Sequence, residues 1–424
     1  MLPFIAFAQR INPPAATWWA IVRPALALVL TVASAASARA ADTGISFQRI
    51  QVTDVFWSEG AHAGDFNRDG RTDICAGPYR YAGPDFKGRH EYATPPTKPY
   101  DGEKGYSDYF LTYPYDFDGD GWLDILVFYT PGKETAWFRN PQNKPGLWER
   151  HVIMAESNGE SPALGDINGD GRPEILAFTA GQLGFGELDW KNPAAKVTFR
   201  PISPVDAKKY FRYTHGYGFG DINGDGRVDI LEKDGWWEQP RDYRSGESWA
   251  HHAFDFSPAG VRGGAQMLIF DINGDGWNDV VTSWDAHGYG LAWYEQTRRN
   301  GEISFKEHLL VNTKETDNPH GVKFTQIHAL VAADVNGDGL MDFITGKRFW
   351  AHGPLKDAEP NAPAVLYWFE LRRNGHAADF IPHLIDENSG VGTQITTGDL
   401  NGDGLIDVLS SNKKGVHVFL QQKR

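Results

Sequence analysis

The chain has 424 residues, which is more than one ordinary core usually spans, so we expect several domains or one repeat architecture. It contains 47 Gly and 25 Pro, and this abundance of turn residues favours an all-β protein. The net charge is −14 and no basic run is present, which argues against nucleic-acid binding. The single cysteine, Cys75, excludes an internal disulfide; we interpret it as a small buried strand residue rather than a catalytic thiol.

Residues 1–40 have the pattern of a secretory signal peptide. Two arginines precede an apolar run at 24–33, and small residues then lead to Ala38-Arg39-Ala40. The run is shorter than a membrane span, although an N-terminal membrane anchor is the alternative interpretation. We therefore expect residues 41–424 to be secreted or periplasmic after cleavage, and not to span a membrane.

The most informative feature is the nine-residue pattern D-x-[D/N]-x-D-G-x-x-[D/E], which occurs seven times at intervals of 50 to 65 residues. Self-similarity at such a period indicates stacked structural units. Calcium takes about six to eight oxygen ligands, which positions 1, 3, 5 and 9 and the carbonyl at position 7 supply if the loop folds tightly. The glycine at position 6 permits that turn because it tolerates a positive φ.

The sequence thus predicts up to seven mainly structural Ca²⁺ ions. The predicted side-chain ligands occupy positions 1, 3, 5 and 9 of the seven copies: Asp65, Asn67, Asp69, Asp73; Asp116, Asp118, Asp120, Asp124; Asp166, Asn168, Asp170, Glu174; Asp221, Asn223, Asp225, Asp229; Asp271, Asn273, Asp275, Asp279; Asp334, Asn336, Asp338, Asp342; Asp399, Asn401, Asp403, Asp407.

Other calcium motifs fit less well. An EF-hand requires flanking helices and Glu at position 12, which only the copy with Glu232 has. Dockerin-like modules would show two closely spaced copies. Short β-prone segments follow the pattern instead, such as ILVFY at 125–129, so the turn joins two strands.

These turns resemble those of the FG-GAP/VCBS repeat family, the propeller type also found in integrin α-subunit heads. The resemblance implies an all-β, seven-bladed β-propeller, with calcium between the first and second strands of each blade. Aromatic third strands, such as GELDWKNP at Gly186 and GWWEQP at Gly235, agree with it. We interpret paired aromatic residues on these strands, such as Trp137-Phe138, as packing between blades. Residues 78–108 lack such a strand and predict a longer excursion. The last repeat ends after its third strand, so we expect ISFQRIQV at Ile45 to form the outer strand of the last blade and close one monomeric domain over 41–424.

We expect ligands on the face opposite the turns, which is formed by the residues before each first strand and by the loops joining second to third strands. Six residues before each motif stand Glu59, Phe110, Glu160, His215, Ala265, His328 and Thr393, with Gln266 and Gln394 one step nearer. The loops add Tyr79, Arg80, Trp284, Asp285, His287, Tyr289, Lys347, Arg348, Trp350, His352, Asn412 and Lys413. His151, His252, His308 and His383 recur on fourth strands and are interpreted as structural.

Three functions remain open at this point. The first is binding of a carbohydrate or protein ligand on that face. The second is a sugar-directed lyase, dehydratase or isomerase, an activity suggested by a loose resemblance to the propeller of aldos-2-ulose dehydratase; a third is an adhesion or assembly protein. For an enzyme, the candidate catalytic and substrate-holding residues are His215, His287, His320, His328, Tyr213, Tyr289, Arg212, Lys347 and Arg348.

Overall fold

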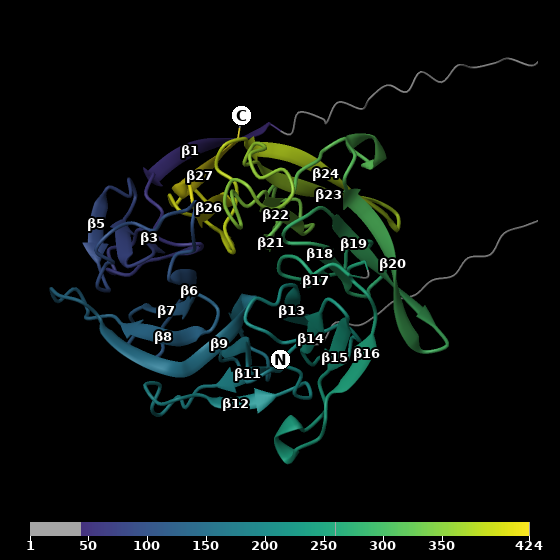
Figure 1. Cartoon of the computed structure of the whole chain (residues 1–424), viewed down its shortest axis with the longest axis horizontal. Coiled ribbons are helices and arrows are strands. Elements are labelled where there is room, and N and C mark those ends of the chain that lie inside the picture. Colours follow the sequence, from purple (N-terminus) through teal and green to yellow (C-terminus); the bar gives the residue numbers. More distant parts are fainter. Residues whose placement is uncertain (1–43, 259, 424) are drawn as a thin grey trace, which may run out of the picture. The chain divides into compact units, whose positions relative to one another are not determined.

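The computed structural model describes residues 44–258 and 260–423 (Figure 1). The predicted signal peptide, residues 1–40, lies outside the described residues. Apart from the 3₁₀ helices η1 (Tyr243–Ser245) and η2 (Glu315–Asp317), the regular structure consists of antiparallel β-strands. No helix in the described residues is long and apolar enough to cross a membrane.

Each sheet is a meander in which the Asp-rich turn joins the first strand to the second. Four sheets contain four consecutive strands each: β2 (Ala61–Gly64), β3 (Asp73–Ala76), β4 (Tyr79–Ala82) and β5 (Gly88–Glu91); β13 (Tyr217–Gly220), β14 (Asp229–Glu232), β15 (Gly235–Glu238) and β16 (Ala250–Ala253); β17 (Leu268–Phe270), β18 (Asp279–Ser283), β19 (Leu291–Arg299) and β20 (Glu302–Val311); and β21 (Leu330–Ala333), β22 (Asp342–Gly346), β23 (Leu366–Asn374) and β24 (Ala377–Asp386).

A fifth sheet has seven strands because one long strand serves two meanders. Strand β9 spans 17 residues, and it pairs with β8 through its first half and with β10 through its second half. The strands of this sheet are β6 (Tyr109–Tyr115), β7 (Asp124–Tyr129), β8 (Lys133–Arg139), β9 (Glu149–Gly165), β10 (Glu174–Thr179), β11 (Gln182–Glu187) and β12 (Thr198–Pro201).

The sixth sheet joins the first strand to the last. It has the order β1 (Ile45–Thr53), β27 (Gly415–Lys423), β26 (Asp407–Asn412) and β25 (Ile395–Gly398). Ile45 lies opposite Lys423, and β1 runs beside β27 in Figure 1. The predicted pairing of the segment at Ile45 with the last repeat is therefore present.

Two strand predictions need correction. Residues 78–108 do contain a third and a fourth strand, β4 and β5, so the excursion is confined to 92–108. In the third repeat the third strand is β11, which ends at Glu187, whereas the predicted segment GELDWKNP starts at Gly186 and places Trp190 in the strand. Trp190 lies in a turn and packs against Phe117.

Aromatic side chains on the third strands lie in the buried clusters between neighbouring repeats. Trp137 belongs to a cluster that includes Ile175 of the following repeat, while its neighbour Phe138 belongs to one that includes Cys75 of the preceding repeat. This alternation confirms the predicted inter-sheet packing. The fourth-strand histidines are structural as predicted: His151, His252, His308 and His383 lie with ring centroids 4.1 to 4.5 Å from Trp137, Trp236, Trp293 and Trp368.

The first strands of all seven repeats line one cavity of 440 Å³. Each strand contributes at least one side chain; these include His62, Tyr113, Leu164, Phe219, Ile269, Val331 and Thr396. The sheets shown in Figure 1 are thus arranged around a shared axis.

Several third strands carry a side-chain amide that donates a hydrogen bond to the Asp-rich turn of the preceding repeat. The Nε2 atom of Gln421 donates to the carbonyl of Val335 (2.9 Å), and its Oε1 accepts from the backbone N–H of Ile406 (3.0 Å). Asn140, Gln239 and Gln296 make the same contact with the preceding turn, donating to the carbonyls of Phe66, Ile167 and Ile222. These amides therefore fasten neighbouring sheets together.

We expect Gln421→Ala to lower the free energy of unfolding by about 2–3 kcal/mol, because it leaves a buried carbonyl and a half-buried N–H without their partners. The matched control is Gln422→Ala, since the adjacent side chain is exposed and bonds only to Gln48 among the described residues. Denaturant titration of both variants measures the difference. Equal stabilities would show that the amide does not fasten the sheets.

Candidate functional site

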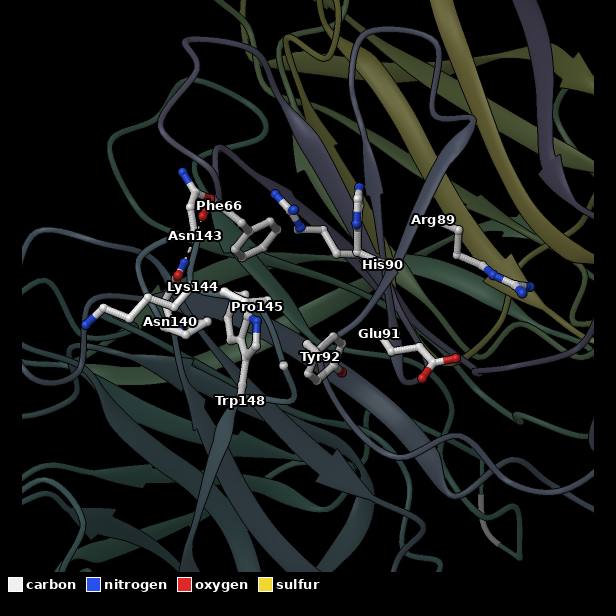
Figure 2. Close-up of a pocket in the computed structure, with 13 residues that line it drawn as sticks. Phe66, Arg89, His90, Glu91, Tyr92, Asn140, Asn143, Lys144, Pro145 and Trp148 are labelled. Atoms are coloured by element: carbon white, nitrogen blue, oxygen red, sulfur yellow. Dashed lines mark hydrogen bonds between the residues drawn. The ribbon is translucent and has the colours of Figure 1, made fainter.

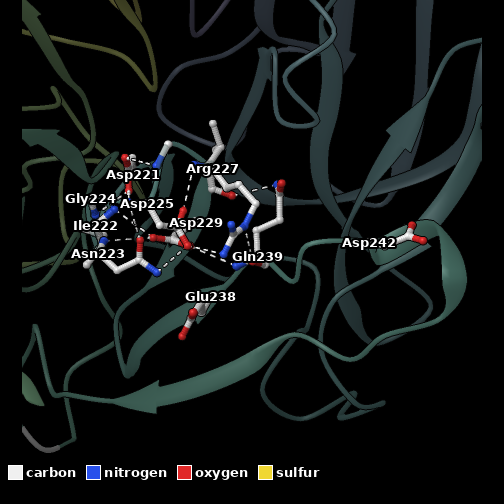
Figure 3. Close-up of polar contacts among 12 residues, drawn as sticks. Asp221, Ile222, Asn223, Gly224, Asp225, Arg227, Asp229, Glu238, Gln239 and Asp242 are labelled. Carbon is white, nitrogen blue, oxygen red and sulfur yellow. Dashed lines mark hydrogen bonds and ion pairs between the residues drawn. The ribbon is translucent and has the colours of Figure 1, made fainter. Parts of the chain in front are cut away.

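In the Asp-rich turns, backbone N–H groups donate to side-chain oxygens of the motif residues, and Figure 3 shows these contacts in the fourth copy. In the fourth copy, Asp221 accepts from the N–H groups of Asp225 (3.1 Å) and Gly226 (2.9 Å), and Asn223 accepts from Asp225 (3.0 Å). Gly226 has φ of 84°, as predicted for position 6. Position 4 also needs a positive φ; it is Gly in six copies and Arg68, at φ 56°, in the first.

The acid at position 9 is buried in every copy. In five copies, all except those of Asp73 and Glu174, it joins the turn to the third strand or to the residue that follows that strand. In Asp229, Oδ2 accepts from the N–H of Ile222 and Oδ1 from the N–H of Gln239, the residue whose amide clamps the preceding repeat. Burial raises the pKa of Asp124, Glu174, Asp229 and Asp342 to about 7. A cation beside such a carboxylate would favour its ionised form.

The donor set of the turns suits calcium. Carboxylate oxygens of Asp116, Asp118 and Asp124 lie within 4.8 Å of one another. Oxygen atoms from carboxylates and amides are the ligands that a hard cation prefers. The residues present therefore fit the predicted ion.

A second polar centre lies at the opposite ends of the first strands. Because the turn follows each first strand, the residue six positions before the turn is at the other end, and so are the loops that join second to third strands. All seven residues at that position are at most 3% exposed. Glu59, Glu160, His215 and His328 are the ionisable ones.

Glu59 and Glu160 share a buried arginine. Nη2 of Arg348 lies 2.9 Å from Oε2 of Glu59, and Nη1 lies 3.1 Å from Oε2 of Glu160. All three side chains are at most 3% exposed. Arg348 follows β22, whereas the two acids come from the first and third repeats, so this triad joins three repeats across the axis.

Three histidines gather beside the triad. Nε2 of His215 lies 3.2 Å from Nε2 of His287, and ring centroids of His215, His287 and His328 are 5.0 to 5.4 Å apart. Nδ1 of His328 donates to the carbonyl of Gln326 (3.1 Å), so its buried Nε2 faces the cluster and has no hydrogen-bond partner among the described residues. Burial lowers the pKa of His215 and His328 well below the ordinary value, so both are neutral at pH 7.

Asp357 supports the histidines from the loop between β22 and β23. Its carboxylate accepts from Nδ1 of His352 (2.8 Å) and lies 3.4 Å from Nδ1 of His287. Burial opposes its ionisation, but the contacts with both histidines lower the pKa of Asp357 below the usual range. Asp357 and Gln326 both have a positive φ, which is strained backbone for such residues and typical of functional sites.

Lysine and aromatic side chains border this polar centre. Burial lowers the pKa of Lys347 and Lys413 to about 8. Nζ of Lys413 lies 5.2 Å from the ring centroid of Tyr106, which also faces Arg348 at 5.4 Å. The ring of Tyr213 lies 6.2 Å from that of Tyr106.

The structure brings most of the predicted site residues together, but not all. His320 lies apart, because its Nε2 contacts Asp379 on β24 at 2.9 Å. Arg212 is exposed and its guanidinium lies against Gly132, and Tyr289 lies beside Lys323. Sequence reasoning missed Asp357 and Tyr106, which come from long loops that have no equivalent in the other repeats.

A catalytic thiol is not supported. Cys75 is fully buried in β3 and its Sγ donates to the carbonyl of His62. Burial raises the pKa of the Cys75 thiol to about 12. The interpretation as a buried strand residue is therefore confirmed.

A separate cavity of 560 Å³ lies between the β4–β5 hairpin and the loop at 140–148 (Figure 2). Arg89, His90, Lys144 and Trp148 line it. It contains polar groups and the aromatic side chains of Phe66, Tyr92 and Trp148, but no cluster of buried polar atoms without partners among the described residues. It therefore serves as a comparison site for the experiments below.

Comparisons with known proteins agree with this architecture. Residues 116–177 and 271–345 match the family described as FG-GAP-like repeat. The structure of BBS1N in complex with ARL6DN is similar to this chain with a TM-score of 0.52 at 10% identity, covering 90% of this chain and 97% of that one. These two stretches are FG-GAP-like repeats, and the fold of the chain is that of a β-propeller.

Two further solved structures are more distant from this propeller. One is an Agrocybe aegerita lectin that recognises non-reducing terminal N-acetylglucosamine (TM-score 0.46, 15% identity, 88% of this chain and 87% of that one). The other is the rhamnogalacturonan lyase YesW (TM-score 0.41, 13% identity, 89% and 72%). No curated protein matches the sequence.

We expect Arg348→Ala to destabilise the propeller by about 3–5 kcal/mol, because two buried carboxylates lose their partner. Arg372→Ala is the control, since Arg372 is 43% exposed and pairs with Glu370 of its own strand; its effect should stay below about 1 kcal/mol. Thermal and denaturant unfolding measure both. Combining Arg348→Met with Glu59→Gln and Glu160→Gln should restore part of the loss, and a failure to do so would contradict the ion-triad explanation.

Proposed function

We propose that the protein is a secreted, calcium-stabilised, seven-bladed propeller that binds an acidic carbohydrate at the polar centre opposite its Asp-rich turns. The seven-stranded sheet counts as two blades that share β9, so that each of the seven turns belongs to one blade. The signal-peptide pattern of residues 1–40 supports export.

The observation that carries the proposal is a group of buried polar atoms without hydrogen-bond partners among the described residues. Nδ1 of His215, Nε2 of His328 and Nε of Arg348 are all in this state and all belong to the polar centre. Burying an unpaired polar group costs about 1–3 kcal/mol, so a fold retains several at one place where a ligand satisfies them.

The charges and rings around the centre suggest the ligand class. Lys347 and Lys413 are protonated at pH 7, because their pKa of about 8 lies above it, and they can bind a carboxylate. Tyr106 and Tyr213 are partly exposed and offer flat apolar faces for a sugar ring. A uronic acid or a sugar acid has both a carboxylate for the lysines and a sugar ring or chain for the tyrosine faces.

Calcium is the second part of the proposal. The ion would be held by the predicted ligands at positions 1, 3, 5 and 9, and would compensate the buried acid at position 9. When bound, it supplies positive charge and fixes the turn. In this arrangement the metal stabilises the fold and takes no part in ligand chemistry.

Chelation should therefore lower the melting temperature of the purified protein, because ions that bind only the folded state stabilise it by mass action. At 100 times the dissociation constant one site contributes about 2.7 kcal/mol. Calorimetric scans with chelator, Ca²⁺ and Mg²⁺ test this, with restoration expected from Ca²⁺. Identical scans in excess chelator and in Ca²⁺ would count against structural calcium.

Binding of a galacturonic-acid oligosaccharide should weaken as the pH rises through 8, because Lys413 and Lys347 lose their protons. Above that pH the affinity falls by up to about tenfold per pH unit for each lysine. Lys413→Ala should weaken binding at pH 7, whereas Lys413→Arg should make the loss above pH 8 shallower, since arginine stays charged and only Lys347 still loses its proton. Calorimetric titration between pH 6 and 9.5 measures these effects.

Lys144→Ala is the control, because Lys144 lines the separate cavity in Figure 2. If this variant loses binding while Lys413→Ala keeps it, the ligand occupies that cavity and the proposal fails. Binding that does not depend on pH between 7 and 9.5 would also contradict the role of the lysines.

The second candidate is a sugar lyase, dehydratase or isomerase at the same centre. The neutral state of His215 and His328 favours it, since an unprotonated imidazole can accept a proton from carbon beside a carbonyl or carboxylate. Ultraviolet absorbance of the same protein–oligosaccharide mixtures tests this candidate: an unsaturated, absorbing product would appear only if elimination occurs, whereas isomerisation would form no such product.

A further inference from the structure

The three-histidine cluster has the geometry of a metal site that differs from the Asp-rich turns in every ligand. Its potential ligand atoms, one ring nitrogen each from His215, His287 and His328, lie within 4.8 Å of one another. We propose that these histidines bind one divalent transition-metal ion of the Zn²⁺ class at the end of the propeller opposite the calcium turns.

The distances fit an ion between the rings. Two imidazole nitrogens that coordinate one Zn²⁺ at about 2.0–2.1 Å and a tetrahedral angle lie roughly 3.3 Å apart. The Nε2 atoms of His215 and His287 lie 3.2 Å apart. The three rings are inclined to one another by 73° to 85°, so they form a tripod rather than a stack.

The outer contacts orient two of the rings as metal ligands. Nδ1 of His328 donates to the carbonyl of Gln326, which leaves the lone pair of its Nε2 toward the cluster. Nδ1 of His287 faces the carboxylate of Asp357. Backbone carbonyls and carboxylates are the usual second partners of metal-bound histidine.

Without a cation this arrangement leaves polar atoms unsatisfied. If the third ring, His215, is protonated on Nδ1, two Nε2 lone pairs face each other at 3.2 Å; if it is protonated on Nε2, its buried Nδ1 lacks a partner among the described residues. One cation between the rings removes the first conflict and takes Nε2 of His328, so that Nδ1 of His215 and Nε of Arg348 are the unpaired atoms left for the proposed carbohydrate. Three neutral imidazoles suit Zn²⁺, Co²⁺ or Ni²⁺, whereas Ca²⁺ and Mg²⁺ prefer oxygen.

The test is metal binding by the purified protein in excess Ca²⁺, which saturates the turns. After removal of transition metals, titration with Zn²⁺ should show one tight site per chain, and Co²⁺ should give the visible absorption of a nitrogen-coordinated ion. His287→Gln changes the most exposed of the three side chains and removes a ligand. It should weaken Zn²⁺ binding by more than the roughly 10–100-fold expected when a residue that only hydrogen-bonds to a ligand is lost. Asp357→Asn should weaken it by about 10–100-fold.

His320→Gln is the matched control, because His320 contacts Asp379 away from the cluster and should bind Zn²⁺ like the unchanged protein. Circular dichroism and melting confirm that each variant is folded. The proposal is overturned if no tight site is found, if His287→Gln leaves it intact, or if Ca²⁺ displaces the ion. Since no carbohydrate is added, failure of the proposed ligand leaves this result unaffected.

Discussion

The buried carboxylate at position 9 of each Asp-rich turn is the contact on which the propeller depends. In five of the seven copies one of its oxygens accepts from a backbone N–H of the turn, and the other accepts from a backbone N–H at the third strand of the same blade. In four blades the strand residue so held then extends an amide to the preceding blade. Burial makes the carboxylate costly to ionise. The protonation state of this one group therefore affects the turn, the third strand and the contact with the preceding blade together.

The two polar regions of the propeller, the Asp-rich turns and the polar centre opposite them, differ in how their residues recur between blades. The turns are built from oxygen donors and backbone N–H groups and recur with little change. The opposite centre is assembled from single residues that differ between blades: two acids, two histidines and, from the loops, Arg348 and His287. The recurring turns and strands form the scaffold, and the residue that differs between blades at the position before each first strand provides the reactive groups.

The repeat register made much of this predictable. Glu59, Glu160, His215 and His328 were found from sequence because they occupy the same place relative to the turn in every repeat. His320 was placed wrongly, since it lies in the long loop before β21, where register gives no guidance. Asp357 and Tyr106 could not be found for the same reason. The misplaced third strand, β11, contains Gly184 and Gly186, which pack closely against Phe199 and Val197 and give no strand signal.

The pairing of β1 with β27 has a consequence for the order of folding. During synthesis β1 emerges first and β27 last, so β1 exposes an unpaired edge for nearly the whole time that the chain is being made. The blades between them can form locally as each meander is completed, but the final sheet requires two distant segments to meet. Formation of that sheet is therefore the step at which a nascent chain either becomes a finished ring or offers its open edges to another molecule.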